Sequence, residues 1–372
     1  MSESSLPEQD APRIRDFLLS LGASEEEITK AAEEHQLELL AIERLLLPAG
    51  GLFSRVELSA RTGMPLELSS RFWRALGFPD ADDEEEVFTE LDVEAVSIVQ
   101  GLLSLGLVDV EAAIQLGRVL GSSMSRLAEA QVTMTQVREA GLSPAQAAEN
   151  FALVADATLP SLARLIDYAW RRHLLAAAKR AVMAGAVQDE GSTQMQIDLT
   201  IGFADMVGFT VLSQQLPDSA LGEVIARFEA TAYDNITSQG GGIVKMIGDE
   251  FMFVADEPAC AARIALALSE AHRVDEELED LRVGLAYGKV IARDGDYFGP
   301  IVNLASRIVD LARPGTILTS ADFRDAVGPE DNEDFTWRPV RIRYIRGIGK
   351  VHLWSLRPGT SDIDVQAQQS KS

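Results

Sequence analysis

Two aspartates stand where predicted strands of the C-terminal half end or turn. Asp205 follows the alternating run from Ile197 to Phe203, and Asp249 follows Gly248 between two apolar runs. If a sheet places these strands side by side, the two carboxylates converge at one end of it. Converging carboxylates repel each other, and two Mg²⁺ ions bound with nucleotide phosphates relieve that repulsion. Taken singly, each aspartate is also a common turn residue.

A second pair of polar residues lies on one predicted helix. Asn303 and Arg307 follow a helix start at Gly299-Pro300, and their spacing of four puts both side chains on the same helix face. Taken alone, the pair is also what a helix-start asparagine and an unrelated surface arginine would give.

The elements that must position these residues follow from the apolar pattern. From residue 194 onward strands alternate with helices, and we expect an α+β domain over residues 194–358. The expected helices are 219–238, 258–277 and 301–311. The expected strands are 197–203, 243–247, 251–254, 281–287 and 290–293, followed by three late strands. The two pairs within this series, 243–247 with 251–254 and 281–287 with 290–293, are expected to form hairpins.

The N-terminal half has helical periodicity from residue 11 to about residue 186. We expect an all-helical domain over residues 1–190, with breaks at 48–51, 77–80, 141–144 and Pro160. After Pro160 the pattern predicts one long connecting helix over about 161–187. A polar segment at 188–193 then marks the domain boundary, and residues 359–372 are expected to form a disordered tail.

Composition limits the classes of partner. The net charge is −25, and both halves are acidic, which disfavours broad contact with nucleic-acid phosphates or anionic lipid. No run of about 18 uncharged apolar residues is present, and the N-terminus lacks the layout of a signal peptide. The single cysteine, Cys260, excludes an internal disulfide. We therefore expect a cytoplasmic protein with no membrane insertion and no DNA partner.

Three motifs in the C-terminal half carry a family resemblance. The strings FADMVGFT (203–210), KMIGD (245–249) and NLASR (303–307) resemble the class III adenylyl and guanylyl cyclases in order and interval. The resemblance covers about residues 195–356. It implies a ferredoxin-like palm fold and a homodimer in which each active site is built from two chains.

The resemblance also implies roles for the polar residues. Asp205 and Asp249 match the metal-binding aspartates, with the main-chain carbonyl of Met206 completing one shell, and they would hold two Mg²⁺ or Mn²⁺ ions. Asn303 would orient the ribose, and Arg307 would stabilise charge on the α-phosphate. The expected reaction converts ATP to cyclic AMP and pyrophosphate.

Three further positions match residues that bind the nucleotide. Lys245 and Asp296 match the pair that binds the purine, and an ammonium with a carboxylate complements the N1 acceptor and the exocyclic amine of adenine. The family's guanylyl members usually have Glu and a small polar residue there, so ATP is the expected substrate. Arg346 in IRGIGK aligns with a basic residue that contacts the terminal phosphates.

In that family one protomer supplies the metal aspartates, and the other supplies the purine and transition-state residues. Lys245 and Asp249 are only four residues apart, yet they would serve opposite active sites. A homodimer would therefore hold two complete sites, and a monomer none.

Two other interpretations compete with this one. The string IGDEF around Asp249 is similar to the GGDEF motif of diguanylate cyclases, but Ile247 replaces its first glycine, and FADMVGFT and NLASR do not belong to that family. The other interpretation is a DNA-binding regulator or nucleotide sensor with a degenerate cyclase domain. The presence of every expected catalytic residue disfavours it.

The N-terminal half has less specific signals. Residues 54–78 resemble a helix-turn-helix with Gly63 at the turn, and the acidic run 80–86 that follows favours a packing motif over a DNA reader. The layout of a helical half, a long helix and a cyclase domain resembles mycobacterial cyclases with a regulatory N-terminal domain, including pH-responsive ones. His173, in the connecting helix, is either a pH sensor or a solvated side chain beside two arginines.

Overall fold

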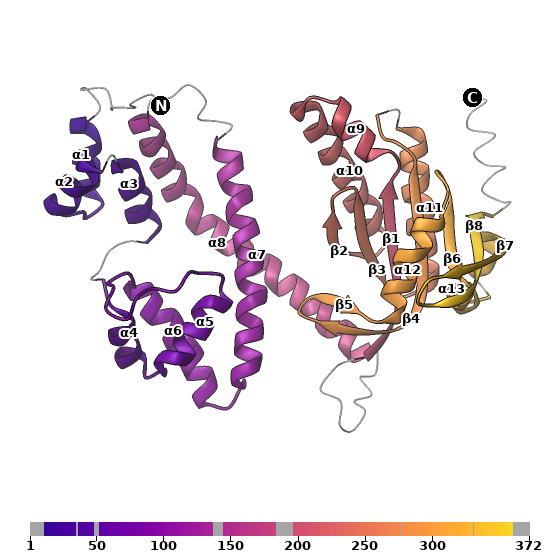
Figure 1. Cartoon of the computed structure of the whole chain (residues 1–372), viewed down its shortest axis with the longest axis horizontal. Helices are drawn as coiled ribbons and strands as arrows, with labels where there is room; N and C mark the ends of the chain where they lie inside the picture. The colour runs from indigo at the N-terminus through magenta and orange to yellow at the C-terminus, as the bar shows by residue number, and fades with distance from the viewer. Residues whose placement is uncertain are drawn as a thin grey trace. The chain divides into compact units, whose positions relative to one another are not determined.

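The computed structural model describes residues 11–34, 36–47, 52–136, 144–183, 196–275, 277–329 and 331–359. The chain divides into two compact units, Met1–Leu174 and Leu175–Ser372 (Figure 1). The division falls inside the long helix α8 (Pro144–Met183), so the last turns of α8 belong to the second unit. The end of the expected connecting helix, the polar segment 188–193 and the tail beyond Gly359 lie outside the described residues.

The described part of the first unit is helical, as the periodicity predicted. Its helices before α8 are α1 (Ala11–Ser20), α2 (Glu25–Glu33), α3 (Leu37–Leu46), α4 (Arg55–Thr62), α5 (Leu66–Ala75), α6 (Glu90–Ser104) and α7 (Val110–Gln136). Capping boxes at Ser24, Ser54 and Thr89 begin α2, α4 and α6. Each of these residues is followed three positions later by an acid whose carboxylate accepts a hydrogen bond from the backbone amide of the capping residue. One apolar cluster joins α1 to α3, and a second contains Leu58 and Val96, from α4 and α6.

The predicted helix break at Pro160 is wrong. α8 runs through Pro160, with helix on both sides of it. Proline removes one helical hydrogen bond and crowds the carbonyl four residues earlier, which often ends a helix. Here alanines and leucines on both sides favour helix strongly enough for it to continue. The predicted break at 77–80 falls in the loop between α5 and α6, as expected.

The second unit is built on one mixed sheet. Its strands are β1 (Gln196–Met206), β2 (Gly242–Ile247), β3 (Glu250–Ala255), β4 (Leu281–Arg293), β5 (Asp296–Phe298), β6 (Ile317–Ser320), β7 (Phe335–Ile345) and β8 (Gly349–Pro358). The order is β2-β3-β1-β4-β6-β8-β7, with β5 paired to β4. The first four strands, in the order β2-β3-β1-β4 with a helix after β1 and another after β3, form the predicted ferredoxin-like palm.

Helices cover both faces of this sheet (Figure 1). They are α9 (Phe209–Gln215), α10 (Asp218–Ser238), α11 (Pro258–Val274), α12 (Pro300–Leu311) and α13 (Ala321–Ala326), with a short 3₁₀ helix at Asp331–Asp334. α10, α11 and α13 pack into the apolar cluster of one face, and α12 packs into the cluster of the other. Gly284 of β4 allows α12 this close approach, because a Cβ there would lie 2.4 Å from the amide nitrogen of Val309.

The expected hairpin between 281–287 and 290–293 is wrong. These residues form one continuous strand, β4, which pairs with β1 from Met206 opposite Leu281 to Gln196 opposite Ile291. Gly288 stays in register within this ladder, so it marks no turn. The chain turns later, at Asp294-Gly295, where both residues have positive φ and lead into β5. The other expected hairpin is present as β2 and β3.

Candidate active site

A row of three charged residues crosses neighbouring strands of the sheet near one end of those strands. β1 lies between β3 and β4, and Asp205 stands opposite Glu250 on one side and Arg282 on the other. Side chains two apart on a strand share a face, and Phe203 packs in the cluster beneath α12. Asp205 therefore faces the α12 side, where it forms an ion pair with Arg282.

Asp249 reaches the same place from the β2–β3 turn. The Met206 amide donates a hydrogen bond to the main-chain carbonyl of Asp249, at 3.0 Å. Gly248 supplies the left-handed conformation that this tight turn needs, with φ of 65°. The structure thus brings Asp205, the backbone of Met206 and Asp249 together in one chain.

Negative charge accumulates at this end of the sheet. Burial raises the pKa of Asp205; the Arg282 guanidinium opposes this shift, and the Asp249 and Asp310 carboxylates add to it. Burial raises the pKa of Glu250 to about 7, and the carboxylates of Asp205, Asp310 and Asp249 add to the shift. A divalent cation would relieve this repulsion, as Arg282 does for Asp205.

The donor atoms suit a hard divalent cation. Asp205 and Asp249 offer carboxylate oxygens, and Met206 offers a main-chain carbonyl, which are the ligand types that Mg²⁺ and Mn²⁺ prefer. Within the described ranges, no group of three or more His, Cys, Asp and Glu side chains is placed to hold a metal by itself. The rest of the shell would therefore have to come from water and from a substrate rich in oxygen, such as a polyphosphate.

Lys245 and Asp296 form a second polar group. They come from β2 and β5, which are not neighbours in the sheet, and their side chains form an ion pair of 2.5 Å. The other oxygen of Asp296 accepts the Tyr297 amide at 2.8 Å. Lys245 stands opposite Met252, which packs in the cluster beneath α12, so this pair shares a sheet face with Asp205. Both side chains are partly exposed and accessible to a ligand.

Asn303 and Arg307 lie on the outer face of α12. Ala305, Ile308 and Val309 on the same helix are buried against the sheet, whereas Asn303 and Arg307 are exposed. Within the part of the chain that the structure describes, the Arg307 guanidinium forms one ion pair, with the exposed Asp310 carboxylate at 3.3 Å. The helix therefore presents an amide and a guanidinium outward, as the spacing predicted.

Arg346 lies elsewhere in the chain. It is exposed in the turn that joins β7 to β8, where Ile345 pairs with Gly349. β7 is the terminal strand of the sheet, and β4, β6 and β8 separate it from β1. The fold does not place Arg346 beside Asp205 of the same chain.

Sequence reasoning missed Arg282 and Asp310. Arg282 was one charged residue inside an apolar strand run, and only the register of β1 with β4 shows that it faces Asp205. Asp310 was one acid near the end of a helix, and it contributes to the charge around Asp205 and Glu250. Neither residue carries a local signal, because both contacts join segments far apart in sequence.

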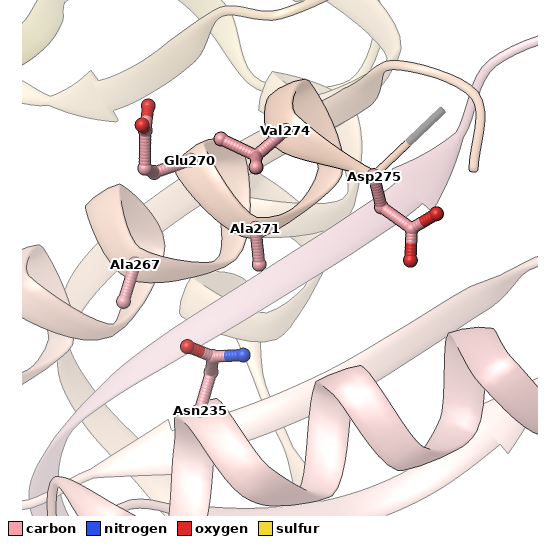
Figure 2. A pocket seen from close by; sticks show the side chains of 6 residues that line it. All are labelled: Asn235, Ala267, Glu270, Ala271, Val274 and Asp275. Carbon is pink, nitrogen blue, oxygen red and sulfur yellow. The ribbon is translucent and has the colours of Figure 1, made fainter. Parts of the chain in front are cut away.

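A shallow pocket lies away from this site, between α10 and α11 (Figure 2). Alanines and a valine of α11 form its apolar part, with Asn235 from α10. Its two acids are already paired, Glu270 with Arg273 and Asp275 with Arg227. None of the predicted catalytic or binding residues lines it.

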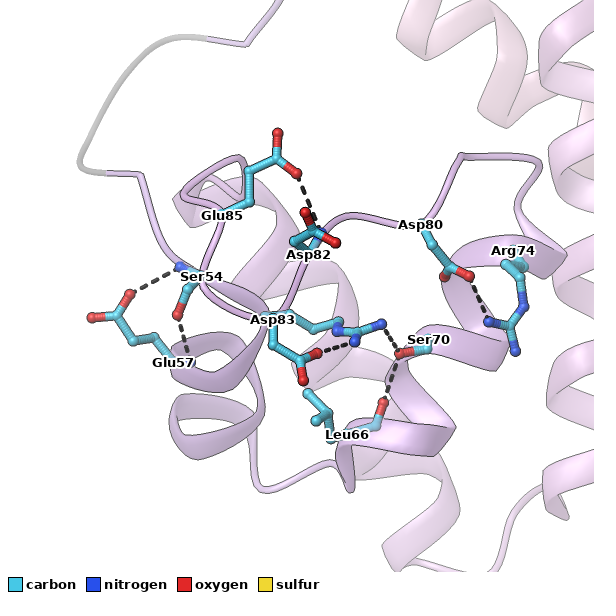
Figure 3. Close-up of polar contacts among 10 residues, drawn as sticks. Ser54, Glu57, Leu66, Ser70, Arg74, Asp80, Asp82, Asp83 and Glu85 are labelled. Atoms are coloured by element: carbon cyan, nitrogen blue, oxygen red, sulfur yellow. Dashed lines mark hydrogen bonds and ion pairs between the residues drawn. The ribbon is translucent and has the colours of Figure 1, made fainter.

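In the first unit, α4 and α5 form the predicted helix-turn-helix around Gly63, whose φ is 70°. Each arginine of the motif is paired with an acid outside it: Arg55 with Asp83, Arg61 with Glu90, Arg71 with Glu111 and Arg74 with Asp80. Figure 3 shows Arg74 with Asp80, and Ser70 bonded to the carbonyl of Leu66. A DNA reader needs basic groups available for phosphates. These pairs favour a packing role.

Comparison with known proteins agrees with the two units. Residues 8–177 match the family model described as adenylate cyclase regulatory domain, and residues 192–358 match the adenylate and guanylate cyclase catalytic domain. An adenylate cyclase of Streptomyces coelicolor is 36% identical over 346 residues, covering 85% of this chain and 89% of the relative. The chain belongs to the class III adenylate cyclase family.

Other members of the family are similar over most of their length. An adenylate cyclase of Glutamicibacter nicotianae is 32% identical over 332 residues, covering 86% of this chain and 82% of the relative. A Mycobacterium tuberculosis protein named pH-sensitive adenylate cyclase is 32% identical over 357 residues, covering 94% and 88%. The predicted resemblance to class III cyclases, including mycobacterial ones, is confirmed. In the described part of this cyclase, no helix is long and apolar enough to cross a membrane.

Proposed function

We propose that this adenylate cyclase converts ATP to cyclic AMP and pyrophosphate in two active sites shared between two copies of the chain. The ribose 3′-oxygen forms a bond to the α-phosphorus, and the bond from that phosphorus to the β-bridging oxygen breaks. Pyrophosphate departs with the electron pair, and the hydroxyl proton passes to solvent. Two Mg²⁺ or Mn²⁺ ions, when bound, would lower the pKa of the 3′-hydroxyl and offset triphosphate charge.

The chain's own residues divide into two sets. Asp205, Asp249 and the Met206 carbonyl would hold the ions at the end of β1. Asn303 would orient the ribose, and Arg307 would stabilise the charge that gathers on the α-phosphate.

Nucleotide recognition would fall to the ion pair described above. Lys245 donates to adenine N1, and Asp296 accepts from the exocyclic amine. Arg346 would contact the terminal phosphates. Because all three side chains are partly or fully exposed, they are accessible to a nucleotide bound at the surface of the domain.

Arg282 would join the phosphate-binding groups. Its guanidinium pairs with Asp205 and is one-third exposed at its side chain. A cation bound by Asp205 would compete for the same carboxylate, which frees the guanidinium for a phosphate oxygen nearby. Arg282 would thus stabilise the site in both states.

The exposure of Asn303 and Arg307 supports a site completed by a second copy. Both are exposed on α12, while Asp205 lies at the end of β1 and Asp249 in the β2–β3 turn. In α8, the side chains of residues 158–180 include large apolar groups that are exposed, among them Leu165, Tyr168, Trp170 and Leu174. Such a surface is suited to burial against another chain.

The observation that carries the proposal is the convergence of Asp205 and Asp249 on a face that also holds Lys245 and Asp296. Purified protein incubated with ATP or GTP and Mn²⁺ or Mg²⁺ should release cyclic AMP from ATP, several-fold faster than cyclic GMP from GTP. Excess EDTA should stop the reaction. Equal use of GTP would contradict adenine recognition, and no turnover with any pair would favour a nucleotide sensor.

We also propose that the helical half regulates the cyclase through α8, since an active site shared by two chains responds to any change in how the two chains meet. Residues 8–177 match a regulatory family model, which supports this assignment. Removing residues 1 to about 190 should change specific activity and flatten its pH profile. Identical rate, dimer affinity and pH profile in the shortened chain would contradict it.

A further inference from the structure

β5 carries an exposed aromatic residue that none of the roles above uses. Phe298 is 48% exposed, whereas Phe251 and Phe253 of β3 are fully buried, as is usual for phenylalanine. Among the described residues, Phe298 belongs to neither of the apolar clusters that fill the two faces of the sheet. Its ring therefore still has apolar surface in water, and covering that surface is favourable for a ligand that binds beside it.

The direction of the Phe298 side chain follows from its strand. Tyr297 packs against the apolar cluster beneath α12. Because side chains alternate along a strand, Asp296 and Phe298 both project from the other side of β5. Side chains two apart on a strand are separated by roughly 6–7 Å. The phenyl ring thus stands next to the carboxylate that pairs with Lys245.

The shape of a purine makes this neighbour useful. Its hydrogen-bonding groups lie on its edge, where the proposed pair Lys245–Asp296 would bind them, and its two faces are flat π surfaces. A site that binds the edge with polar groups therefore also needs apolar or aromatic groups against a face. Phe298 supplies an accessible aromatic ring beside the pair, which is itself partly exposed.

The position of Phe298 along the chain points to the same ligand. Gly299, with φ of 132°, follows it directly and leads into α12, where Asn303 is proposed to orient the ribose. Phe298 thus stands between the residue proposed for the base and the residue proposed for the ribose. Its ring is placed for the nucleoside part of a nucleotide, and the triphosphate has its own proposed groups.

We propose that Phe298 is a nucleoside-binding residue whose ring packs against the face of the purine and the adjoining ribose. This inference rests on the proposed use of the Lys245–Asp296 pair in nucleotide recognition. Every purine has a π face, so stacking does not distinguish one base from another. Phe298 would therefore add affinity for ATP and GTP alike, while the polar pair selects between them.

The test uses the full chain and measures kcat and KM for ATP, with GTP and inorganic tripolyphosphate as competing inhibitors. Phe298→Ala should raise both KM for ATP and the inhibition constant of GTP by about tenfold, as expected for loss of one base-stacking ring. kcat should stay within about twofold, because the ring contacts the ground state and the transition state equally. Phe298→Tyr keeps the ring and should restore both constants.

Tripolyphosphate separates a local role from general damage. It has the phosphate chain without a nucleoside, so its inhibition constant should be the same in Phe298→Ala and in the unaltered protein. Tyr233→Ala is the matched control, because Tyr233 is 51% exposed on α10, which packs on the sheet face opposite α12. It should leave all constants unchanged.

Three results would overturn the proposal. One is an unchanged KM for ATP in Phe298→Ala. Another is an equal weakening of tripolyphosphate and ATP, which would mean that the change disturbs the whole site. The third is weaker dimerisation of Phe298→Ala in sedimentation with unaltered nucleotide affinity, which would mean that a second chain covers the ring.

Failure of the proposed function is seen separately. If the unaltered protein makes no cyclic AMP, the reaction is wrong, and displacement of a fluorescent ATP analogue by ATP, GTP and tripolyphosphate still measures the contribution of the ring. Weaker binding of both nucleotides to Phe298→Ala, with tripolyphosphate binding intact, would then support the proposal by binding alone. Equal affinities of the two proteins for all three ligands would refute it.

Discussion

At the scale of single residues, the central feature of the site is Asp205, which lies between a carboxylate on one neighbouring strand and a guanidinium on the other. Glu250 and Arg282 flank it in register, and Asp249 approaches from a turn. The sheet would pack more easily with apolar groups at these positions, because buried charges are costly. Their concentration at one sheet end is consistent with a cation site.

Replacing Asp205 or Asp249 by Asn should reduce turnover about 100-fold or more. An amide is a weaker ligand than a carboxylate for a divalent cation, and loss of the bound cation removes several kcal/mol of transition-state charge stabilisation. Initial rates with ATP and Mn²⁺ measure this. The matched control is Asp198→Asn, on the same strand, where an exposed carboxylate pairs with Lys289 at 3.4 Å. The control should stay within about twofold of the unaltered protein. Near-normal activity in either metal variant would contradict the assignment.

The double variant Lys245→Glu, Asp296→Ser tests adenine recognition. It should reduce kcat/KM for ATP by about 100-fold or more, because the new carboxylate at position 245 would face the N1 acceptor of adenine. The exocyclic amine would also lose its carboxylate acceptor at position 296. Lys289→Glu changes an exposed lysine on β4 in the same way and serves as the control. Unchanged ATP kinetics in the double variant would remove the proposed role of the pair.

At the scale of elements, the helix pair α10–α11 supports the sheet from the face opposite α12. His272 of α11 is buried, its ring lies edge-on to Phe228 of α10 at 5.6 Å, and its Nδ1 lies 2.9 Å from the Glu279 carbonyl. Its Nε2 is buried with no partner among the described residues. Burial lowers the pKa of His272 below its ordinary value of 6.5. Above pH 6.5 the folded chain therefore holds a neutral imidazole at this position.

This burial gives stability a pH dependence with a definite sign. Below pH 6.5 the unfolded chain takes up a proton that the folded chain does not, so the free energy of unfolding falls as pH decreases towards the folded-state pKa. The loss is at most about 1.4 kcal/mol per pH unit. Urea midpoints of the catalytic unit at pH 8, 6.5 and 5.5 measure it.

The variant His272→Asn should have a lower free energy of unfolding at pH 8 than the unaltered protein. Its free energy of unfolding should then fall less steeply as the pH decreases. His352→Asn, which removes an exposed histidine, should keep the original slope. Parallel declines in the unaltered protein and in His272→Asn would show that other groups cause the acid sensitivity.

At the scale of the whole molecule, each proposed active site combines the metal-binding aspartates of one chain with Asn303 and Arg307 of the other. A single chain would therefore hold no complete site, and a dimer would hold two. Asp205→Ala protein and Arg307→Ala protein should each be inactive. After subunit exchange in equal amounts, half of the dimers are mixed and each has one intact site, so activity should recover to about one quarter of normal. Mixing Asp205→Ala with Asp249→Ala should give no recovery, because both changes fall in the same set. Proven exchange without recovery in the first mixture would mean that each chain carries a whole site.

Much of the architecture was predictable because it depends on local pattern. Alternation over 197–203 predicted β1, the spacing of apolar residues predicted α10 and α12, and Gly248 marked a real hairpin. The predictions failed where the signal of one residue competed with its surroundings. Gly288 resembles a turn residue, yet the ladder with β1 keeps β4 continuous, and Pro160 resembles a helix break, yet the helix-forming residues around it continue α8. The propensity of one residue is too weak to outweigh such context.

For the site, the sequence by itself determined which residue types carry the chemistry: Asp205, Asp249, Lys245, Asp296, Asn303 and Arg307 follow from motif and spacing. Only the tertiary structure decided their surroundings. It put Arg282 beside Asp205, joined Lys245 to Asp296 across non-neighbouring strands, and left Arg346 at the far edge of the sheet. These contacts depend on strand order and register, which arise from packing of the whole sheet and leave no trace in any short stretch of sequence.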